Sequence, residues 1–348
     1  MTDLATSDPV SAPAMPSAPR LRTALSFRNI SALYIFAFLF VLFSLWVPET
    51  FLTAGVWRSL LADSSLTALV AIAVTIPLSA GAFNLAVGTE VGMAAILGAW
   101  LLEKQHVGVV PALALTLVVG CGIGAVTGAL IVRAKIDSFI ATLGMSSILL
   151  ALISWVSGGQ QILNLPSSFQ SLATNELLGL AYPLWIMLAV GLVVWYVLQR
   201  TPTGRRVYAT GGNINAARLA GVPTARVIVL SLVSCGVIAA LAGLLTSARL
   251  AVGDPTVGPG YLLPAYAAAF LGSTQFHGGR YNVWGAVIAV YVLAVGVKGL
   301  QLAGAPVWIP DLFNGVALLL AVGMSKYQRT ARRSAAVARI LRRGEARA

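Results

Sequence analysis

Ten long apolar segments follow one another along this chain of 348 residues. A helix needs about 20 apolar residues to cross the hydrocarbon core of a bilayer. With 58% hydrophobic and 10% charged residues, the chain has more apolar surface than a soluble core could bury. We therefore expect an all-α polytopic membrane protein with about ten transmembrane helices, over residues 31–48, 65–82, 85–102, 109–132, 138–157, 182–199, 227–248, 261–274, 283–302 and 307–325.

The basic residues predict how these segments are oriented. Nineteen of the 23 Lys and Arg lie on one side if both termini share that side, and an excess of Lys and Arg marks cytoplasmic loops. We expect a disordered basic tail over residues 1–28, a transmembrane domain over 29–325, and a basic cytoplasmic tail over 326–348. The net charge of +12 follows this topology, so we expect no nucleic-acid partner.

The longest basic interior loop covers residues 201–226, between the sixth and seventh predicted spans. Asn213 or Asn215 is placed to cap a short helix over residues 216–220, and Gly221 and Pro223 are placed to end it. A short capped helix on the cytoplasmic face predicts a docking element that a cytoplasmic partner pushes on.

A weak internal repeat joins residues 81–88, GAFNLAVG, to residues 272–279, GSTQFHGG. Each has Gly at both ends and an amide side chain between them. Glycine-interrupted apolar segments in two halves of a transporter point to its translocation site, although two such octamers in a glycine-rich chain also arise by chance. The candidates for the pathway are residues of these two octamers together with one acid inside a predicted span, Glu90. They are Gly81, Asn84, Gly88, Glu90, Gly272, Gln275 and Gly279.

Glu90 lies within the predicted span 85–102, about two turns from its start. A carboxylate inside a membrane is a functional candidate, because it is costly to place there. The alternative is that it lies near the cytoplasmic end and pairs with Arg133 or a polar neighbour. Segment 261–274, which contains Pro264, is either an interrupted helix lining a pathway or a tilted span. Gly124 and Gly128 form a GxxxG pattern that indicates close helix packing.

Enzymatic chemistry is not supported by the sequence. No lysine precedes Ser or Thr, so the phosphate-binding GxxxxGK[ST] loop is missing and any ATP must be hydrolysed by a partner. The two His and two Cys are too far apart in sequence to indicate a metal site or a catalytic triad. We expect no metal, no cofactor and no catalytic residue.

Four blocks carry a resemblance to a known family: GAFNLAVGTEVGMAA (81–95), GALIVRAKIDSFIATLGMSSI (128–148), GRRVYATGGNINAARLAGV (204–222) and GPGYLLPAYAAAFLGSTQFHGG (258–279). In this order they resemble the ribose-type permeases of ATP-binding cassette importers, over roughly residues 55–325. The resemblance implies an inner-membrane permease that pairs with a second permease copy or paralogue. It also implies two cytoplasmic ATPase subunits and a periplasmic binding protein that delivers a small sugar.

The resemblance also assigns roles to residues. It implies that the ATPase docks on Gly211, Gly212, Asn213, Ala216, Ala217 and Gly221, and that the glycine-marked turns lie beside the pathway. Several positions depart from the family, which usually has Asp-Leu-Ser-Val-Gly at residues 84–88 and Ser-Leu near Gln275-Phe276. Asn84 stands where the family usually has Asp, and Glu90 stands where it has a small or apolar residue.

Two alternatives stay open. The same machine could carry a branched-chain amino acid or a nucleoside, since related permeases resemble this fold. An ion-coupled secondary carrier working alone would be a different class of protein. Such a carrier needs no cytoplasmic docking helix and more buried acids, so the sequence favours an importer permease for a monosaccharide or related polyol.

Overall fold

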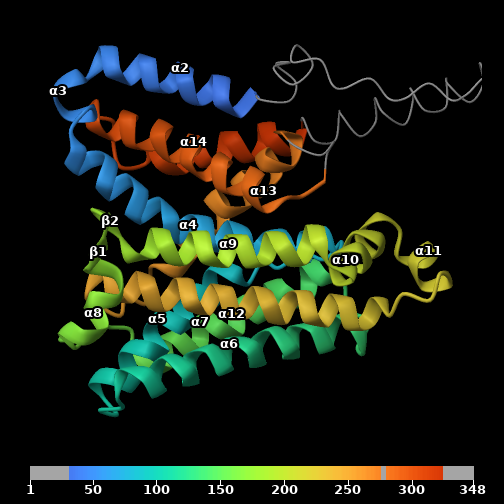
Figure 1. Ribbon diagram of the computed structural model, residues 1–348. Coiled ribbons are helices and arrows are strands. Elements are labelled where there is room, and N and C mark those ends of the chain that lie inside the picture. The colour runs from blue at the N-terminus through green and yellow to red at the C-terminus, as the bar shows by residue number, and fades with distance from the viewer. Residues whose placement is uncertain (1–30, 276–279, 324–348) are drawn as a thin grey trace, which may run out of the picture.

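The computed structural model describes residues 31–275 and 280–323, and this part of the chain is almost entirely helical (Figure 1). Its elements are α2 (Ser31–Trp46), α3 (Pro48–Phe51), α4 (Ala54–Ser79), α5 (Val87–Glu103), α6 (Val109–Val132), α7 (Ser138–Ser157), α8 (Ser167–Thr174), the strands β1 (Glu176–Leu177) and β2 (Leu180–Ala181), α9 (Tyr182–Arg200), α10 (Pro202–Gly212), α11 (Ile214–Leu219), α12 (Thr224–Leu250), the 3-10 turn η1 (Gly258–Tyr261), α13 (Leu262–Gln275), α14 (Val283–Leu302) and a last helix over Ile309–Gly323.

The helical, polytopic fold expected from the apolar segments is present. Among the described residues, six helices are long and apolar enough to cross a membrane, namely α4, α6, α7, α9, α12 and α14. The other four expected spans coincide with the shorter helices α2, α5, α13 and Ile309–Gly323. The expected tails, 1–28 and 326–348, lie outside the described residues.

The boundaries differ from the predicted ones where charges interrupt an apolar run. The helix α4 begins at Ala54, whereas the predicted span begins at residue 65. The prediction was late because Arg58 and Asp63, which lie in the first turns of α4, interrupt the apolar run. Asp63 forms an ion pair with Arg249 near the end of α12, with Nε 3.2 Å from Oδ1. Between the predicted spans 138–157 and 182–199, the structure contains the short helix α8 and the β1–β2 hairpin, which were not anticipated.

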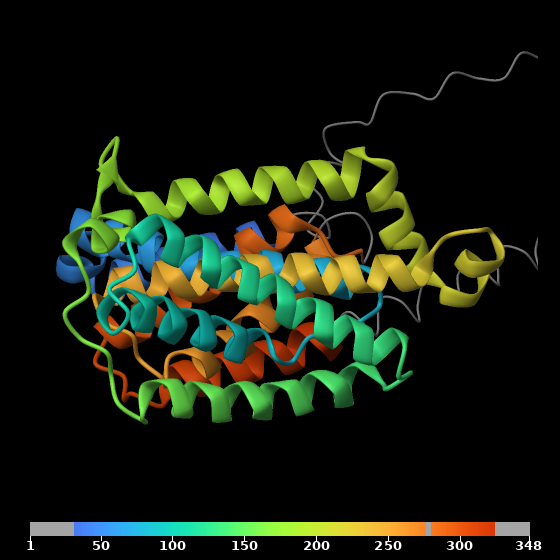
Figure 2. The same cartoon turned by 90° about the horizontal axis from the view of Figure 1, so that it is seen from below.

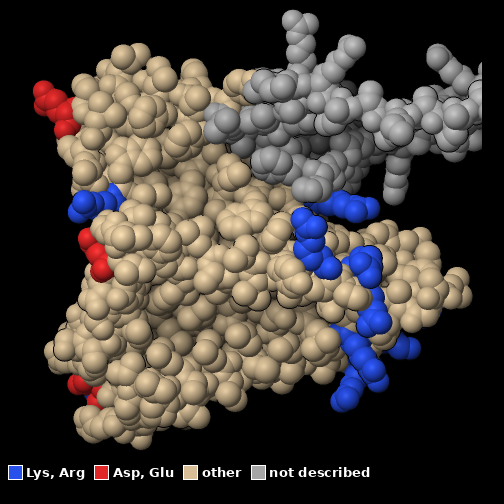
Figure 3. Space-filling model, viewed as in Figure 1, with Lys and Arg blue, Asp and Glu red and all other residues tan. Residues whose placement is uncertain are grey.

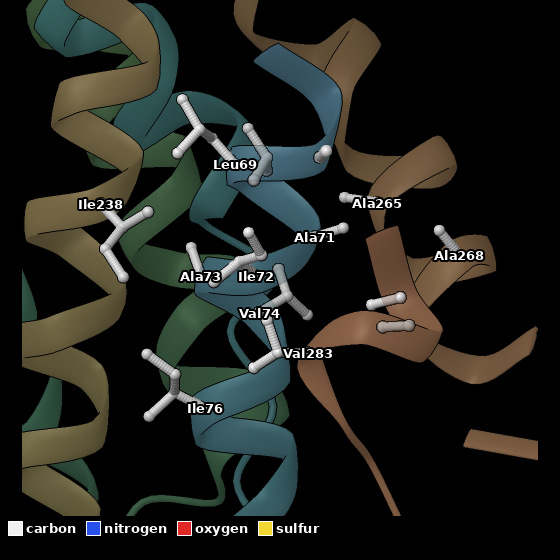
Figure 4. Packing of buried hydrophobic residues seen from close by; sticks show 14 of the residues in the cluster. Leu69, Ala71, Ile72, Ala73, Val74, Ile76, Ile238, Ala265, Ala268 and Val283 are labelled. Atoms are coloured by element: carbon white, nitrogen blue, oxygen red, sulfur yellow. The ribbon is translucent and has the colours of Figure 1, made fainter. Parts of the chain in front are cut away.

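The helix α4 forms the centre of the main hydrophobic core. Its residues Leu69 and Ile72 are fully buried. Figure 4 shows them between α12, which contributes Ile238, and the α13–α14 pair, which contributes Ala265 and Val283. A helix that is apolar on all sides is buried among other helices, which explains why α4 shows no amphipathic pattern.

The helices α6 and α12 pack closely through glycine. A Cβ on Gly120 would come within 2.7 Å of the Gly236 carbonyl oxygen, and one on Gly128 would come within 2.9 Å of the Val229 Cα. A Cβ on Gly124 would overlap the backbone of Leu232. The packing role predicted for the GxxxG pattern is therefore confirmed.

Connections between the helices gather at two ends of the molecule (Figure 1). One end, called here the α11 end, carries α10, α11 and both ends of the described chain. The opposite α8 end carries α3, α8 and the hairpin. Most basic side chains in view lie at the α11 end, and acidic ones at the α8 end (Figure 3). Figure 2 shows α7 and α9 on opposite sides of the molecule.

Candidate functional site

A break in the helical core lies between α4 and α5. Pro77 lies in the last turn of α4, which ends at Ser79. The Pro77 carbonyl oxygen accepts a hydrogen bond from the Ala82 N–H at 2.9 Å, where the chain turns out of the helix. Gly81 follows with φ +83°, a left-handed conformation that a side chain would strain. The chain then runs without helix to Val87, where α5 begins. The break exposes backbone groups that need partners in the core.

The side chains of Asn84 and Glu90 meet inside this break. The Asn84 Nδ2 donates to both carboxylate oxygens of Glu90, at 3.1 and 3.2 Å, and lies 3.3 Å from the Cys235 Sγ of α12. Glu90 is 2% exposed and Asn84 is fully buried. Glu90 lies in the first turn of α5, not two turns into a span. Of the two partners considered for it, Arg133 or a polar neighbour, the structure has the polar neighbour Asn84.

Neighbouring helices supply the remaining hydrogen bonds of the break. The Asn84 backbone N–H donates to the Tyr266 hydroxyl of α13 at 3.0 Å, and the Leu85 N–H donates to the Thr142 Oγ1 of α7 at 3.1 Å. The Asn84 Oδ1 accepts from the Ala86 N–H at 3.1 Å. Buried polar groups need such partners to avoid a desolvation cost. Tyr266, Thr142 and Cys235 were missed from the sequence because they lie far from Asn84 along the chain.

Two of the pathway glycines make close backbone contacts. A Cβ on Gly88 would come within 2.9 Å of the Gly258 carbonyl oxygen, so α5 and η1 touch backbone to backbone. A Cβ on Gly272 would overlap the backbone of Gly285, and the Asn282 Nδ2 donates to the Gly272 carbonyl at 3.2 Å. In the second half of the repeat, the Gln275 side chain and Gly279 lie outside the described residues.

The loop between α9 and α12 contains the short helix α11. The Asn213 Oδ1 accepts hydrogen bonds from the backbone N–H groups of Asn215 at 3.1 Å and Ala216 at 3.0 Å, which caps the helix start. Gly221, with φ +80°, follows the helix end. Ala217 is 6% exposed and turns into the protein, whereas Leu219 is 91% exposed. The sequence pointed to Ala217 as a partner-facing residue; its side chain is buried in the structure, and the exposed Leu219 was not among the residues that the sequence singled out.

The preceding helix α10 is fixed against the break. A Cβ on Gly81 would lie 3.2 Å from the Gly211 Cα, and one on Gly211 would overlap the Ser79 carbonyl oxygen. Gly212 has no such neighbour. The predicted ATPase-docking residue Gly211 and the predicted pathway residue Gly81 are therefore in direct contact.

A second anchor of α10 reaches the α13–α14 connection. The Tyr208 hydroxyl donates to the Tyr281 carbonyl oxygen at 2.8 Å, and the Arg280 guanidinium lies 5.9 Å from the Tyr208 ring centre. Burial raises the pKa of Tyr208, against smaller opposing effects of Ser79 and Arg280, so its hydroxyl is a stable donor. The helix α10 thus contacts the α4–α5 connection through Gly211 and the α13–α14 connection through Tyr208.

At the α8 end, two distant loops are joined. Ile162 and Gly253 exchange backbone hydrogen bonds of 2.9 Å, and the Gln161 Nε2 donates to the Asp254 Oδ2 at 3.0 Å. Burial alone would raise the pKa of Asp254, but hydrogen bonds from Thr256 and Gln161 outweigh it and lower the pKa below 3.8. The loops 158–181 and 251–257 therefore form one surface.

No group of three or more His, Cys, Asp or Glu that could hold a metal lies within 31–275 and 280–323. The buried polar atoms of the break are hydrogen-bonded to one another. Its chemistry is that of a positioning network in the core.

Comparison with known proteins identifies the family. The family model described as "Branched-chain amino acid transport system / permease component" matches residues 56–322. The chain belongs to this family of permeases. It is 32% identical over 280 residues to a ribose import permease of Escherichia coli K12, covering 79% of this chain and 87% of that protein. No solved structure matches.

Two further relatives widen the set of named solutes. An L-arabinose ABC transporter permease of Azospirillum brasilense is 31% identical over 300 residues, covering 86% of this chain and 88% of the relative. An autoinducer 2 import system permease of Photorhabdus luminescens is 30% identical over 261 residues, covering 73% of this chain and 78% of the relative. The resemblance to ribose-type permeases noted in the sequence is confirmed.

Proposed function

We propose that this chain is the membrane permease of an ATP-driven importer that carries a monosaccharide or a related polyol. The observation that supports this most is the match over most of the chain to permeases named for ribose and L-arabinose. The family description also names branched-chain amino acids, which keeps that substrate class as the second candidate. Membership of an importer family argues against a secondary carrier working alone.

The proposed topology has ten spans in the inner membrane, with the α11 end and both termini in the cytoplasm. The charge distribution supports it, because Lys and Arg gather at the α11 end (Figure 3). The helix α13 has 14 residues and extends about 21 Å, so it would cross as a partial span together with η1. The tails 1–28 and 326–348 would then both be cytoplasmic.

The proposed coupling element consists of α10 and α11. A permease without an ATP site must receive force through a contact with its ATPase, and α11 is short, capped and projects from the α11 end (Figure 1). The contact of Gly211 with Gly81 and the bond from Tyr208 to the Tyr281 carbonyl would carry that force into the core. The docking residues would be Gly211, Gly212, Asn213, Ala216 and Gly221, with Leu219 in place of Ala217.

The glycine-marked turns remain the proposed boundary of the translocation pathway, with Gly81, Asn84, Gly88, Glu90, Gly272, Gln275 and Gly279 as candidates. Asn84 and Glu90 are buried and bonded to each other, which supports a role in positioning the break rather than in touching the solute. The touching backbones at Gly88 and Gly258 support a closed passage at this point.

Three protein partners complete the proposed machine: a cytoplasmic ATPase, a periplasmic substrate-binding protein, and a second permease copy or paralogue. The surface joined by Ile162 and Gly253 at the α8 end supports docking of the binding protein, since backbone hydrogen bonds hold its two loops together. No cofactor beyond ATP on the partner subunit is needed.

The test is uptake by proteoliposomes containing the permease and its ATPase, with the binding protein outside and ATP inside. We expect ATP-dependent uptake of one labelled sugar among ribose, arabinose and allose, and no uptake of leucine. Uptake of leucine but of no sugar would mean that the solute is a branched-chain amino acid and not a monosaccharide. Uptake without the ATPase would overturn the importer.

A further inference from the structure

A groove of about 670 Å³ lies between α9 and α12 on the side opposite α7, with Ile76 of α4 at its base. Its walls are aliphatic, and several of them are open to the surroundings: Val193 is 61% exposed, Val197 37% and Leu230 58%. In Figure 1, α9 and α12 run side by side in front. A partly exposed apolar groove of this kind needs an apolar occupant.

The length of the groove matches one leaflet of a bilayer. Along α9 it extends from Ala189, near the middle of the helix, to Leu198, near its end at α10. Nine helical steps rise about 14 Å, and half of the hydrocarbon core is about 15 Å. The groove therefore covers the depth that one acyl chain occupies, on the side of the α11 end.

The mouth of the groove is positively charged. Arg206 of α10 and Arg226 of α12 both line it, and both are exposed. Within the described ranges neither arginine has an ion-pair partner, and no acidic residue lines the groove. The start of α12, at Thr224, adds the positive end of a helix dipole at the same place. The mouth is suited to an anionic group.

Two other occupants fit less well. A sugar needs many hydrogen bonds, and the polar groups away from the mouth are two serines, Ser231 and Ser234. A second copy related by a twofold axis along the membrane normal would bring its own Arg206 and Arg226 to the same level. Like charges facing each other at such a contact are unfavourable.

We propose that this groove binds an anionic phospholipid of the cytoplasmic leaflet, with one acyl chain between α9 and α12 and its phosphate at Arg206 and Arg226. Basic pockets between transmembrane helices on the cytoplasmic side suit such headgroups. The occupied groove separates α9 and α12 beside α10, so the lipid stabilises the position of the proposed coupling element. The site does not depend on the solute, but it requires the α11 end to be cytoplasmic.

The experiment titrates the purified full-length permease with dioleoyl phosphatidylglycerol and follows the first bound lipid by native mass spectrometry. The double variant Arg206→Gln/Arg226→Gln should weaken binding about 25-fold, roughly fivefold for each arginine. The matched control is Arg205→Gln/Arg218→Gln, which removes the same charge from exposed arginines outside the groove. Val193→Trp fills the groove without changing charge and should also weaken binding. Dioleoyl phosphatidylcholine should bind much less tightly than phosphatidylglycerol.

Several results would overturn the proposal. Equal weakening by both double variants would indicate general attraction to a basic surface. Displacement of the lipid by glycerol 3-phosphate at millimolar concentration would indicate a phosphate site without an acyl chain. Disulfide-linked permease dimers formed through Val193→Cys in membranes would place a second copy in the groove. Labelling of Thr203→Cys from the periplasmic side would show that the α11 end is not cytoplasmic. That result would refute the topology and can be told apart from a loss of lipid binding.

Discussion

The amide nitrogen of Asn84 lies 3.1 and 3.2 Å from the two carboxylate oxygens of Glu90, wholly inside the helical core. Both positions are among those at which the resemblance to ribose-type permeases implies a departure, with an acid expected at the first and a small or apolar residue at the second. Because the two side chains are bonded to each other, we expect a substitution at either position to alter the effect of a substitution at the other. The acid that is bonded in the break between α4 and α5 lies in the first turn of α5.

Glu90→Ala should destabilise the protein by about 1–3 kcal/mol, because it leaves the Asn84 amide without its acceptors in a buried site. Thermal unfolding of the purified permease in detergent measures the change. The exchange Asn84→Asp/Glu90→Gln keeps one acid and one amide in contact and should recover much of the stability that Asn84→Asp loses alone. Additive effects of the two single changes would contradict the coupling.

Gly211→Ala should weaken the contact between α10 and the end of α4, because the new Cβ would overlap the Ser79 carbonyl oxygen. Backbone on both sides leaves little room to adjust, so we expect a loss of a few kcal/mol in stability and strongly reduced ATP-dependent uptake. Gly212→Ala is the matched control for stability, because a Cβ there meets nothing within 4 Å. Equal behaviour of the two variants would mean that α10 does not depend on this contact.

The joined loops at the α8 end should open in acid. The lowered pKa of Asp254 means that its ionised form is stabilised in the folded loops. This contribution is present above the ordinary pKa of Asp and is lost as pH falls through the lowered folded value. Hydrogen exchange at the Ile162 and Gly253 amides should therefore stay slow down to about pH 4 and lose protection below it. In Asp254→Asn, protection at neutral pH should be lower and should not change over this acidic range.

Much of the fold could be predicted from the sequence because a bilayer requires long apolar helices. Each predicted span coincides with a helix, and Asn213 and Gly221 flank α11 as their capping chemistry suggests. Predictions were wrong where tertiary contacts decide. The start of α4 was placed too late because Asp63 and Arg58 looked like a loop. The burial of Ala217 within the short helix α11 is likewise not visible in its composition.

The site was only partly predictable for the same reason. Glycine spacing pointed to the α4–α5 break, but the partners of Asn84 come from α7, α12 and α13. No local pattern joins Cys235 or Tyr266 to a residue more than 150 positions away. The groove between α9 and α12 could not be predicted either. Its arginines, Arg206 and Arg226, looked like the basic residues that any cytoplasmic loop carries.

The last prediction concerns the exposed face of α11. Leu219 is 91% exposed at an end of the protein that we place in water, against 38% for Ile214, the other large apolar side chain of this capped helix. If the ATPase docks on α11, an apolar side chain of this kind is the natural anchor of the contact. Leu219→Asp should therefore weaken binding of the ATPase at least fivefold, corresponding to a loss of more than about 1 kcal/mol, while the permease inserts and unfolds as the wild type does.

Co-purification of the ATPase and its stimulation by loaded binding protein measure this effect. The matched control is Leu178→Asp, an equally apolar residue that is 84% exposed at the opposite end, in the β1–β2 hairpin. It should leave ATPase binding unchanged. By contrast, Ala217→Glu places a charge in a buried position and should reduce the stability of the loop itself. Normal ATPase binding by Leu219→Asp, together with normal uptake, would mean that force enters the permease somewhere other than α11.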